Sequence, residues 1–129
     1  MIRCVRIWTG ADGQSHFEEG KVDLPGGSRG DDVGPDIAAR SISFRETRPG
    51  GAFDWHDAPA RQFVLTLSGT LQFETHSGAT FTIRPGDALL AEDTAGGGHR
   101  WRLMDDSPWR RAYIILEPGA DARFIPDAR

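Results

Sequence analysis

The stretch DWHDAPARQFVLTLSG, residues 54–69, carries a histidine, a small side chain and an amide at even spacing, followed by a Ser-Gly turn. Successive side chains of a β-strand point to opposite faces, so residues an even number apart share a face. His56 and Ala58 therefore share a face, and Gln62 shares it too if the strand pairs without a bulge. The pattern predicts a strand with one imidazole and one amide on the same face.

Outward from this stretch, glycine and proline separate short apolar runs along the whole chain. The sequence has 16 glycines and 8 prolines, and aromatic and β-branched residues concentrate in the runs between them. No stretch keeps the apolar spacing of a long helix. The pattern predicts an all-β sandwich or barrel. We expect hairpin turns at residues 68–69 and 76–78, and strands at residues 5–8, 39–46, 62–67, 70–75, 80–84, 88–92, 99–104 and 112–117.

Composition is typical of a soluble globular protein. Of 129 residues, 38% are hydrophobic and 26% are charged, with a net charge of −4, which excludes nucleic acid and anionic membranes as expected partners. No apolar run reaches the length of a membrane span, and the first ten residues lack a signal-peptide core. The chain has a single cysteine, Cys4, which excludes an internal disulfide. We therefore expect the protein in the reducing environment of the cytoplasm. Arginine supplies all but one of the 15 basic residues, which is typical of a GC-rich bacterial genome.

The chain is most simply interpreted as one domain. Residues 18–36 contain few core-forming side chains, so we expect them to run over the surface or pack against a second copy. The C-terminal tail would either fray or dock through Phe124 and Ile125. The parts that we expect are an N-terminal strand with a surface or dimer arm (1–38), a barrel (39–117) and a tail (118–129).

Five residues in and before the opening stretch have the spacing of a known sequence motif. That motif is usually written G-x5-H-x-H-x3,4-E-x6-G. Gly50, His56, Ala58, Gln62 and Gly69 fall on its positions with the correct spacing. The chain therefore resembles the cupin superfamily, with alanine in place of the second histidine and glutamine in place of the glutamate.

A second, looser match follows further along the chain. The second cupin motif, G-x5-P-x-G-x2-H-x3-N, resembles RPGD at 84–87 followed by Gly96 and His99. Thr94 stands in place of its proline and Leu103 in place of its asparagine. The loop between the turn and the histidine is also longer than usual.

Within the superfamily, the chain is similar to small single-domain bacterial cupins of largely unassigned reaction. Their first motif reads W-H-x-A-P-x-R-Q, and their N-terminal segment T-G-x-D-G-x-S-H-F-E is similar to TGADGQSHFEE at 9–19. The resemblance covers roughly residues 39–117. The resemblance implies a jelly-roll barrel (a double-stranded β-helix) in which His56 points inward and His99 arrives from a facing strand.

The resemblance also implies a metal site inside the barrel. Two neutral imidazoles, His56 and His99, with the Gln62 oxygen as a third ligand, would hold one divalent transition metal (Zn, Ni, Mn or Fe). Because Ala58 supplies no donor and Gln62 no charge, we expect weak or partial occupancy. A carboxylate from residues 92–93 would compensate if the longer loop folds inward. The alternative is a cavity whose histidines bind water or each other, with the glutamine amide satisfied by backbone groups.

Two further residues are candidates for binding a ligand. Trp101 has the parity of His99 and would give the cavity a flat apolar wall, or else belong to the core. Arg45 would meet a carboxylate or phosphate in the cavity, or else face solvent. We expect His76 to be exposed in its hairpin turn and Cys4 to serve only packing.

Three functions stay open at this point. The first is a barrel that binds a small molecule in its cavity, with a weakly held metal at a degenerate two-histidine and glutamine site. The second is an enzyme, metal-dependent or metal-free, of the isomerase or dioxygenase type, with small carboxylate or sugar-like substrates. A metal-free isomerase needs an acid or base beside a histidine, and the neighbouring Asp57 has the parity opposite to His56.

The third is a non-catalytic structural or regulatory dimer with a vestigial site. We expect a homodimer in every case, because the sheet edges of a small sandwich need covering.

Overall fold

The computed structural model describes residues 1–128 and confirms the all-β prediction, since these residues form strands and loops only. None of them belongs to a helix long and apolar enough to cross a membrane. The strands are β1 (Arg3–Thr9), β2 (Ser15–Val22), β3 (Ala39–Thr47), β4 (Ala52–His56), β5 (Gln62–Ser68), β6 (Leu71–Thr75), β7 (Thr80–Ile83), β8 (Ala88–Glu92), β9 (His99–Leu103), β10 (Trp109–Leu116) and β11 (Phe124–Pro126).

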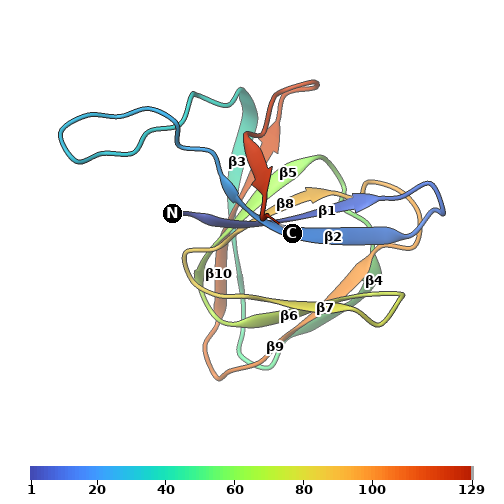
Figure 1. Cartoon of the computed structure of the whole chain (residues 1–129). Helices are drawn as coiled ribbons and strands as arrows, with labels where there is room; N and C mark the ends of the chain where they lie inside the picture. Colours follow the sequence, from blue (N-terminus) through green and yellow to red (C-terminus); the bar gives the residue numbers. More distant parts are fainter. Residues whose placement is uncertain (129) are drawn as a thin grey trace.

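The strands form two sheets around a common interior (Figure 1). One sheet has seven strands in the order β11-β2-β1-β8-β5-β10-β3, and the other has four in the order β4-β9-β6-β7. Between β3 and β10 every connection except that between β6 and β7 crosses from one sheet to the other. The sets β3-β10-β5-β8 and β4-β9-β6-β7 are the two sheets of a jelly roll. The strand order therefore confirms the predicted jelly-roll fold.

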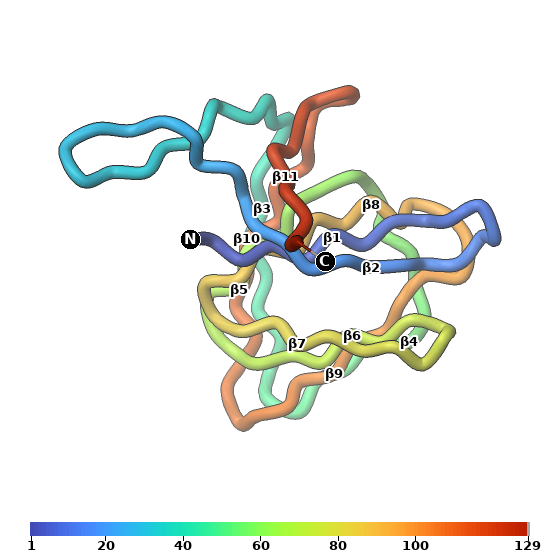
Figure 2. Tube along the Cα trace, viewed as in Figure 1, coloured from blue at the N-terminus to red at the C-terminus, as the bar shows by residue number. Residues whose placement is uncertain are grey.

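Strands β1, β2 and β11 extend the larger sheet beyond the jelly roll. β1 runs parallel to β8 and antiparallel to β2, which in turn pairs with β11. Residues 18–36 were expected to run over the surface or pack against a second copy, but residues 18–22 belong to β2. These residues include few core-forming side chains, and backbone pairing with β1 holds them in the sheet. Residues 23–38 form a loop that projects from the body of the molecule (Figure 2).

The two predicted hairpin turns have different roles. Residues 76–78 join β6 to its antiparallel neighbour β7, as predicted, and Gly78 has a φ of 88°. Residues 68–69 do not form a hairpin, because β5 and β6 lie in opposite sheets. Gly69, with a φ of 90°, turns the chain between the sheets, where an added Cβ would meet the Pro108 carbonyl oxygen at 3.0 Å. The turn chemistry predicted a positive φ, but not which strands would pair.

The space between the sheets holds the main hydrophobic core. Trp109 of β10 lies there, and its Nε1 donates a hydrogen bond to Thr66 Oγ1 at 3.1 Å, which satisfies the only polar group of the indole. Large side chains with almost no exposure join it from both sheets: Val5, Ile7, Leu71, Phe73 and Ile83.

A second cluster covers the opposite face of the larger sheet. It contains Cys4, Phe63 and Leu90, against which the partly buried Phe124 of β11 packs. Burial raises the pKa of the Cys4 thiol to about 12, so the thiol is protonated and unreactive at neutral pH. The prediction that Cys4 serves packing is confirmed.

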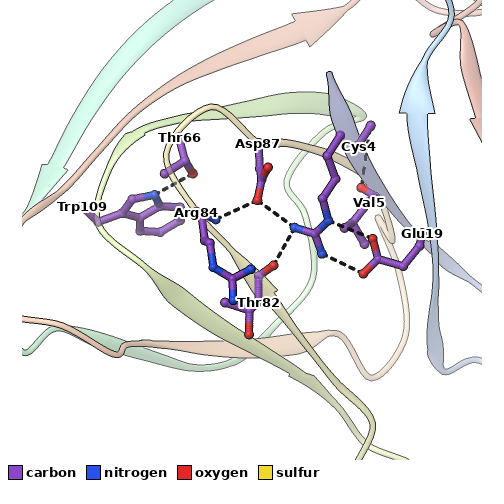
Figure 3. A network of polar contacts seen from close by, with 9 residues as sticks. Cys4, Val5, Glu19, Thr66, Thr82, Arg84, Asp87 and Trp109 are labelled. Atoms are coloured by element: carbon purple, nitrogen blue, oxygen red, sulfur yellow. Dashed lines mark hydrogen bonds and ion pairs between the residues drawn. The ribbon is translucent and has the colours of Figure 1, made fainter. Parts of the chain in front are cut away.

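A polar network joins the two sheets at one end of the molecule (Figure 3). Arg3 of β1 binds Glu19 of β2 and Asp87 in the turn before β8, each at 2.7 Å. The same guanidinium donates to the carbonyl oxygen of Thr82 on β7, in the smaller sheet. Charged hydrogen bonds therefore link the two sheets here, and the cavity described below is lined by other residues.

Candidate functional site

A cavity of about 340 Å³ lies between the sheets and is lined by strands of both. This volume suits a small organic molecule. Its walls are mostly apolar, with a small number of polar groups that converge on the interior. The structure places all of the predicted site residues on this lining: Arg45, His56, Gln62, His99 and Trp101.

The strands that carry these residues into the cavity differ from those predicted. His56 ends β4 and Gln62 begins β5, so they lie in opposite sheets and residues 57–61 cross between them. The prediction that both lie on one strand face was therefore wrong, although Ala58 in the crossing segment also lines the cavity. His99 lies on β9 directly beside β4, paired with His56, and not on a facing strand.

His56 and His99 form an adjacent pair of imidazoles. Their ring centroids are 4.6 Å apart with an interplanar angle of 63°. Burial lowers the pKa of His56, and the neighbouring His99 lowers it further. His56 Nδ1 lies 2.7 Å from the carbonyl oxygen of Asp54, and a carbonyl can only accept, so Nδ1 carries the proton. His56 is therefore neutral at neutral pH, with the lone pair on Nε2.

Asp93 is a partner of His99 that strand parity alone did not identify. It is fully buried, and its Oδ2 lies 2.6 Å from His99 Nδ1. The Ser15 hydroxyl donates to the same oxygen at 2.7 Å. The sequence had suggested a carboxylate at residues 92–93 as a compensating ligand; the loop does fold inward, but Asp93 binds the histidine. The carboxylate fixes the proton on Nδ1 and leaves Nε2 of His99 free.

The other half of that suggestion, Glu92, is engaged elsewhere. Its two carboxylate oxygens pair with Arg6 of β1 and with Arg61. Arg61 immediately precedes Gln62, so its parity along the chain is opposite. The structure places its guanidinium in this partly buried ion pair, away from the cavity.

The Gln62 amide is available to a ligand. The residue is 5% exposed, and its side chain makes no hydrogen bond with the described residues. The alternative interpretation, an amide satisfied by backbone groups, is therefore wrong. Since the amide lines the cavity, it offers one acceptor and two donors there.

Aromatic rings form one wall of the cavity. Trp101 of β9 and Trp109 of β10 pack edge to face with centroids 4.6 Å apart. Phe73 of β6 lies 6.2 Å from Trp109 in a similar arrangement. Trp101 thus belongs to the core and lines the cavity as well, so both interpretations of this residue hold.

Arg45 lies at the exposed side of the cavity. It is on β3, whose side chains are mostly exposed, and its guanidinium carbon is 4.7 Å from the ring centroid of Tyr113. The Arg45 side chain therefore lies at the mouth of the cavity and is exposed to solvent there. His76 is exposed and binds the Gly97 carbonyl oxygen outside the cavity, in agreement with the prediction.

The donors on the cavity fit a weak metal site and not a tightly held resident metal. Within residues 1–128, no group of three His, Cys, Asp or Glu side chains could hold a metal ion. The donors are two Nε2 atoms and the neutral amide of Gln62. Transition-metal sites in proteins usually have at least three imidazole, thiolate or carboxylate ligands.

Comparisons with known proteins give distant likenesses only. No family model and no curated protein matches the chain. It is similar to an uncharacterised conserved protein with a double-stranded beta-helix domain from Klebsiella pneumoniae, with 17% identity and a TM-score of 0.48 over 82% of this chain and 92% of that one. It is also similar to a cupin 2 conserved barrel domain protein from Leptotrichia buccalis, with 14% identity and a TM-score of 0.46 over 64% of this chain.

The chain spans 39% of the length of that Leptotrichia protein. A conserved protein of unknown function from Streptococcus pyogenes matches with 16% identity and a TM-score of 0.45, over 67% of this chain and 69% of that one. The fold assignment comes from the strand order of this chain itself. Its eight central strands alternate between two sheets, and the histidines at the motif positions line the space between them. The chain has a double-stranded β-helix fold of the jelly-roll type.

Proposed function

We propose that this chain binds a small organic molecule in the cavity between its sheets, through His56 and His99. The observation that carries the proposal is the buried hydrogen bond between Asp93 and His99. A buried carboxylate is costly unless it is paired, and here it holds one imidazole in a fixed orientation at the wall of a cavity. Such support is typical of a histidine that binds a ligand through its other nitrogen.

A ligand would contact both the polar groups and the aromatic rings that line the cavity. The Nε2 atoms of His56 and His99 accept hydrogen bonds from a hydroxyl or amine of the ligand, and the Gln62 amide either donates or accepts. Trp101 and Trp109 pack against the apolar part of the ligand. A molecule with a polar end and a flat apolar body matches this arrangement.

A second candidate function is catalysis of proton transfer on the bound molecule. The sequence offered no acid or base beside a histidine, which argued against a metal-free isomerase. Asp93 is such a partner for His99. In this candidate, Nε2 of His99 takes a proton from one carbon or oxygen of the ligand and returns it to another, while Asp93 stabilises the imidazolium.

A weakly bound divalent metal is the remaining expectation for this site. His56 and His99 would supply two nitrogen ligands, and the Asp93 carboxylate would orient one of them. With only a neutral amide as a third donor, the affinity is expected to be low, with partial occupancy at most. The metal would supply Lewis-acid chemistry to the ligand when bound.

The test is a thermal-shift and calorimetric screen of untagged protein against small acids, amides, sugars and hydroxylated aromatic compounds, and against Zn, Ni, Mn and Fe salts. We expect saturable binding that His99→Ala weakens by about 10-fold or more, as loss of a hydrogen bond in a buried site would. His76→Ala is the matched control, since His76 is an exposed histidine outside the cavity. If no compound binds, the cavity is vestigial and the proposal fails. If both variants bind equally well, the ligand does not bind through His99 and the proposed site is wrong.

A further inference from the structure

Arg111 is a buried cation of the cavity wall without a carboxylate partner. It lies on β10 and is only 5% exposed. The ion pairs formed among residues 1–128 do not include it. Burial of an unpaired charge is costly, so buried arginines in proteins almost always face an anion. The side of the Arg111 guanidinium without a protein partner faces the cavity.

Three of the five N–H groups of Arg111 are used by neutral acceptors. Nε donates to the Tyr113 hydroxyl at 3.2 Å. Nη1 donates to Thr47 Oγ1 at 2.8 Å and to the Trp109 carbonyl oxygen at 3.1 Å. Nη2 makes no hydrogen bond with the described residues, nor is it among their fully buried unpaired atoms. Its two N–H groups are therefore the ones that face the cavity, which Arg111 lines.

The guanidinium is held rigidly in this position. Its central carbon lies 3.8 Å from the ring centroid of Trp109 and 5.8 Å from that of Trp101. Stacking on these rings and the three hydrogen bonds fix both the plane and the rotation of the group. A fixed guanidinium with free donors binds an anion without a further loss of side-chain entropy.

Charge around the cavity has the sign that an anion requires. The second cation on the lining is Arg45, at the mouth. Asp57 is the one carboxylate among the described lining residues, and it is exposed in the segment that follows His56. The potential at Arg111 is therefore positive in a partly desolvated site, because Asp57 is exposed and the buried Asp93 carboxylate behind the lining is hydrogen-bonded to His99 and Ser15.

We infer that Arg111 is the binding residue for a carboxylate group, so that the ligand of this cavity is a small organic acid. This inference rests on the proposed small-molecule function and names its ligand class. The carboxylate binds Nη2, the body of the acid packs against Trp101 and Trp109, and a polar group of the acid reaches His56 and His99. A carboxylate is favoured over an inorganic anion because the walls around the guanidinium are aromatic and would be left in contact with water by a bare ion.

The test uses matched pairs of acids and their neutral amides: benzoate and benzamide, propionate and propionamide, succinate and succinamide. Binding is measured by calorimetry and by quenching of the tryptophan fluorescence. We expect at least one acid to bind about 10- to 100-fold more tightly than its amide, the range for hydrogen bonds to a charged group. Arg111→Met should abolish this preference and Arg111→Lys should keep part of it. Arg110→Met, at an exposed arginine on the same strand, is the control and should leave binding unchanged.

Each result separates the inference from the function on which it rests. If amides bind as tightly as their acids in every pair, or if folded Arg111→Met retains the preference, the inference is overturned while a neutral ligand keeps the proposed function. If inorganic phosphate binds as tightly as the best acid, the site takes any small anion and the carboxylate assignment is wrong. If neither acids nor neutral compounds bind, both proposals fail. Circular dichroism and the melting temperature check the fold, and the lysine variant gives the answer if the methionine variant is unfolded.

Discussion

Asp93 determines which nitrogen of His99 faces the cavity. Its Oδ2 receives hydrogen bonds from both His99 Nδ1 and the Ser15 hydroxyl, while its Oδ1 is buried without a partner among the described residues. In this arrangement the carboxylate of Asp93 interacts with one imidazole, that of His99. A purely structural histidine needs no buried charge behind it, so this pair supports the ligand-binding role proposed for His99.

At the scale of single residues, we predict that Asp93→Ala allows both neutral tautomers of His99 to be populated. In the unsubstituted protein, the neutral ring should carry its proton on Nδ1 because the carboxylate accepts it there. In the variant, the population of the Nε2-protonated form should rise, since nothing then holds the proton on Nδ1. Nitrogen-15 NMR of the imidazoles above their titration range measures both forms.

His56 provides an internal control for this experiment. Its Nδ1 binds the backbone carbonyl of Asp54, which the substitution leaves in place. Its tautomer should therefore be the same in both proteins. An unchanged Nδ1 proton on His99 in a folded Asp93→Ala variant would mean that another acceptor sets the tautomer, and the role assigned to Asp93 would be wrong.

Strand pairing brings the site residues together from distant parts of the chain. The register of β4 against β9 pairs His56 with His99, and a register shift between Phe53 and His56 accompanies this pair. A one-residue slip of β9 would turn His99 and Trp101 away from the cavity together, because side chains alternate between the faces. The close packing of neighbouring strands therefore matters to the site as well as to stability.

The contact between β2 and β11 offers a test of such packing. A Cβ added at Gly20 of β2 would overlap the ring of Phe124 and the backbone of Ile125. We predict that Gly20→Ala displaces β11 and lowers the free energy of unfolding by about 1–3 kcal/mol, as overpacking does. Denaturant unfolding measures this change.

Gly26→Ala is the matched control. The nearest atom to an added Cβ would be the Val33 carbonyl oxygen at 3.4 Å, and the φ of Gly26 is not positive. It should be neutral or slightly stabilising, because alanine lowers the entropy of the unfolded chain. Equal effects of the two substitutions would show that β11 does not pack on Gly20 as described.

The whole molecule leaves an apolar area on the outer face of its larger sheet. Ile42 and Phe44 of the edge strand β3 are 60% and 70% exposed, and Leu67 of β5 is 59% exposed. We propose that a second copy of the chain covers this area, because exposed edge strands and apolar patches favour association. A twofold dimer would cover the same patch on both copies.

The dimer prediction is tested by light scattering at micromolar concentration. We expect twice the mass of one chain for the unsubstituted protein, and the mass of one chain for Phe44→Glu, which places a charge in the patch. Phe53→Glu, at an exposed phenylalanine of the smaller sheet, serves as the control and should remain dimeric. A monomeric unsubstituted protein would contradict the proposal.

The sequence predicted the strands of the barrel because alternation and turn chemistry are local. The apolar runs at residues 62–67, 80–84 and 88–92 correspond to β5, β7 and β8 within a residue or two. It did not predict β2, β4 or β11, which are short or rich in charged residues and are stabilised by pairing with neighbours. Motif spacing likewise selected His56, Gln62 and His99, which line one cavity, although the strand geometry assumed for them was wrong.

The tertiary structure alone decided which groups meet. Ser15 and Asp93 are 78 positions apart in the chain, yet they share a hydrogen bond behind His99. Arg111 has the inward parity of Trp109 and Tyr113, a signal present in the sequence, but only the packed sheets show that it lacks a carboxylate partner among residues 1–128. The physical reason is that side-chain direction follows from the local period of a strand, whereas burial, pairing and charge compensation depend on contacts between distant strands.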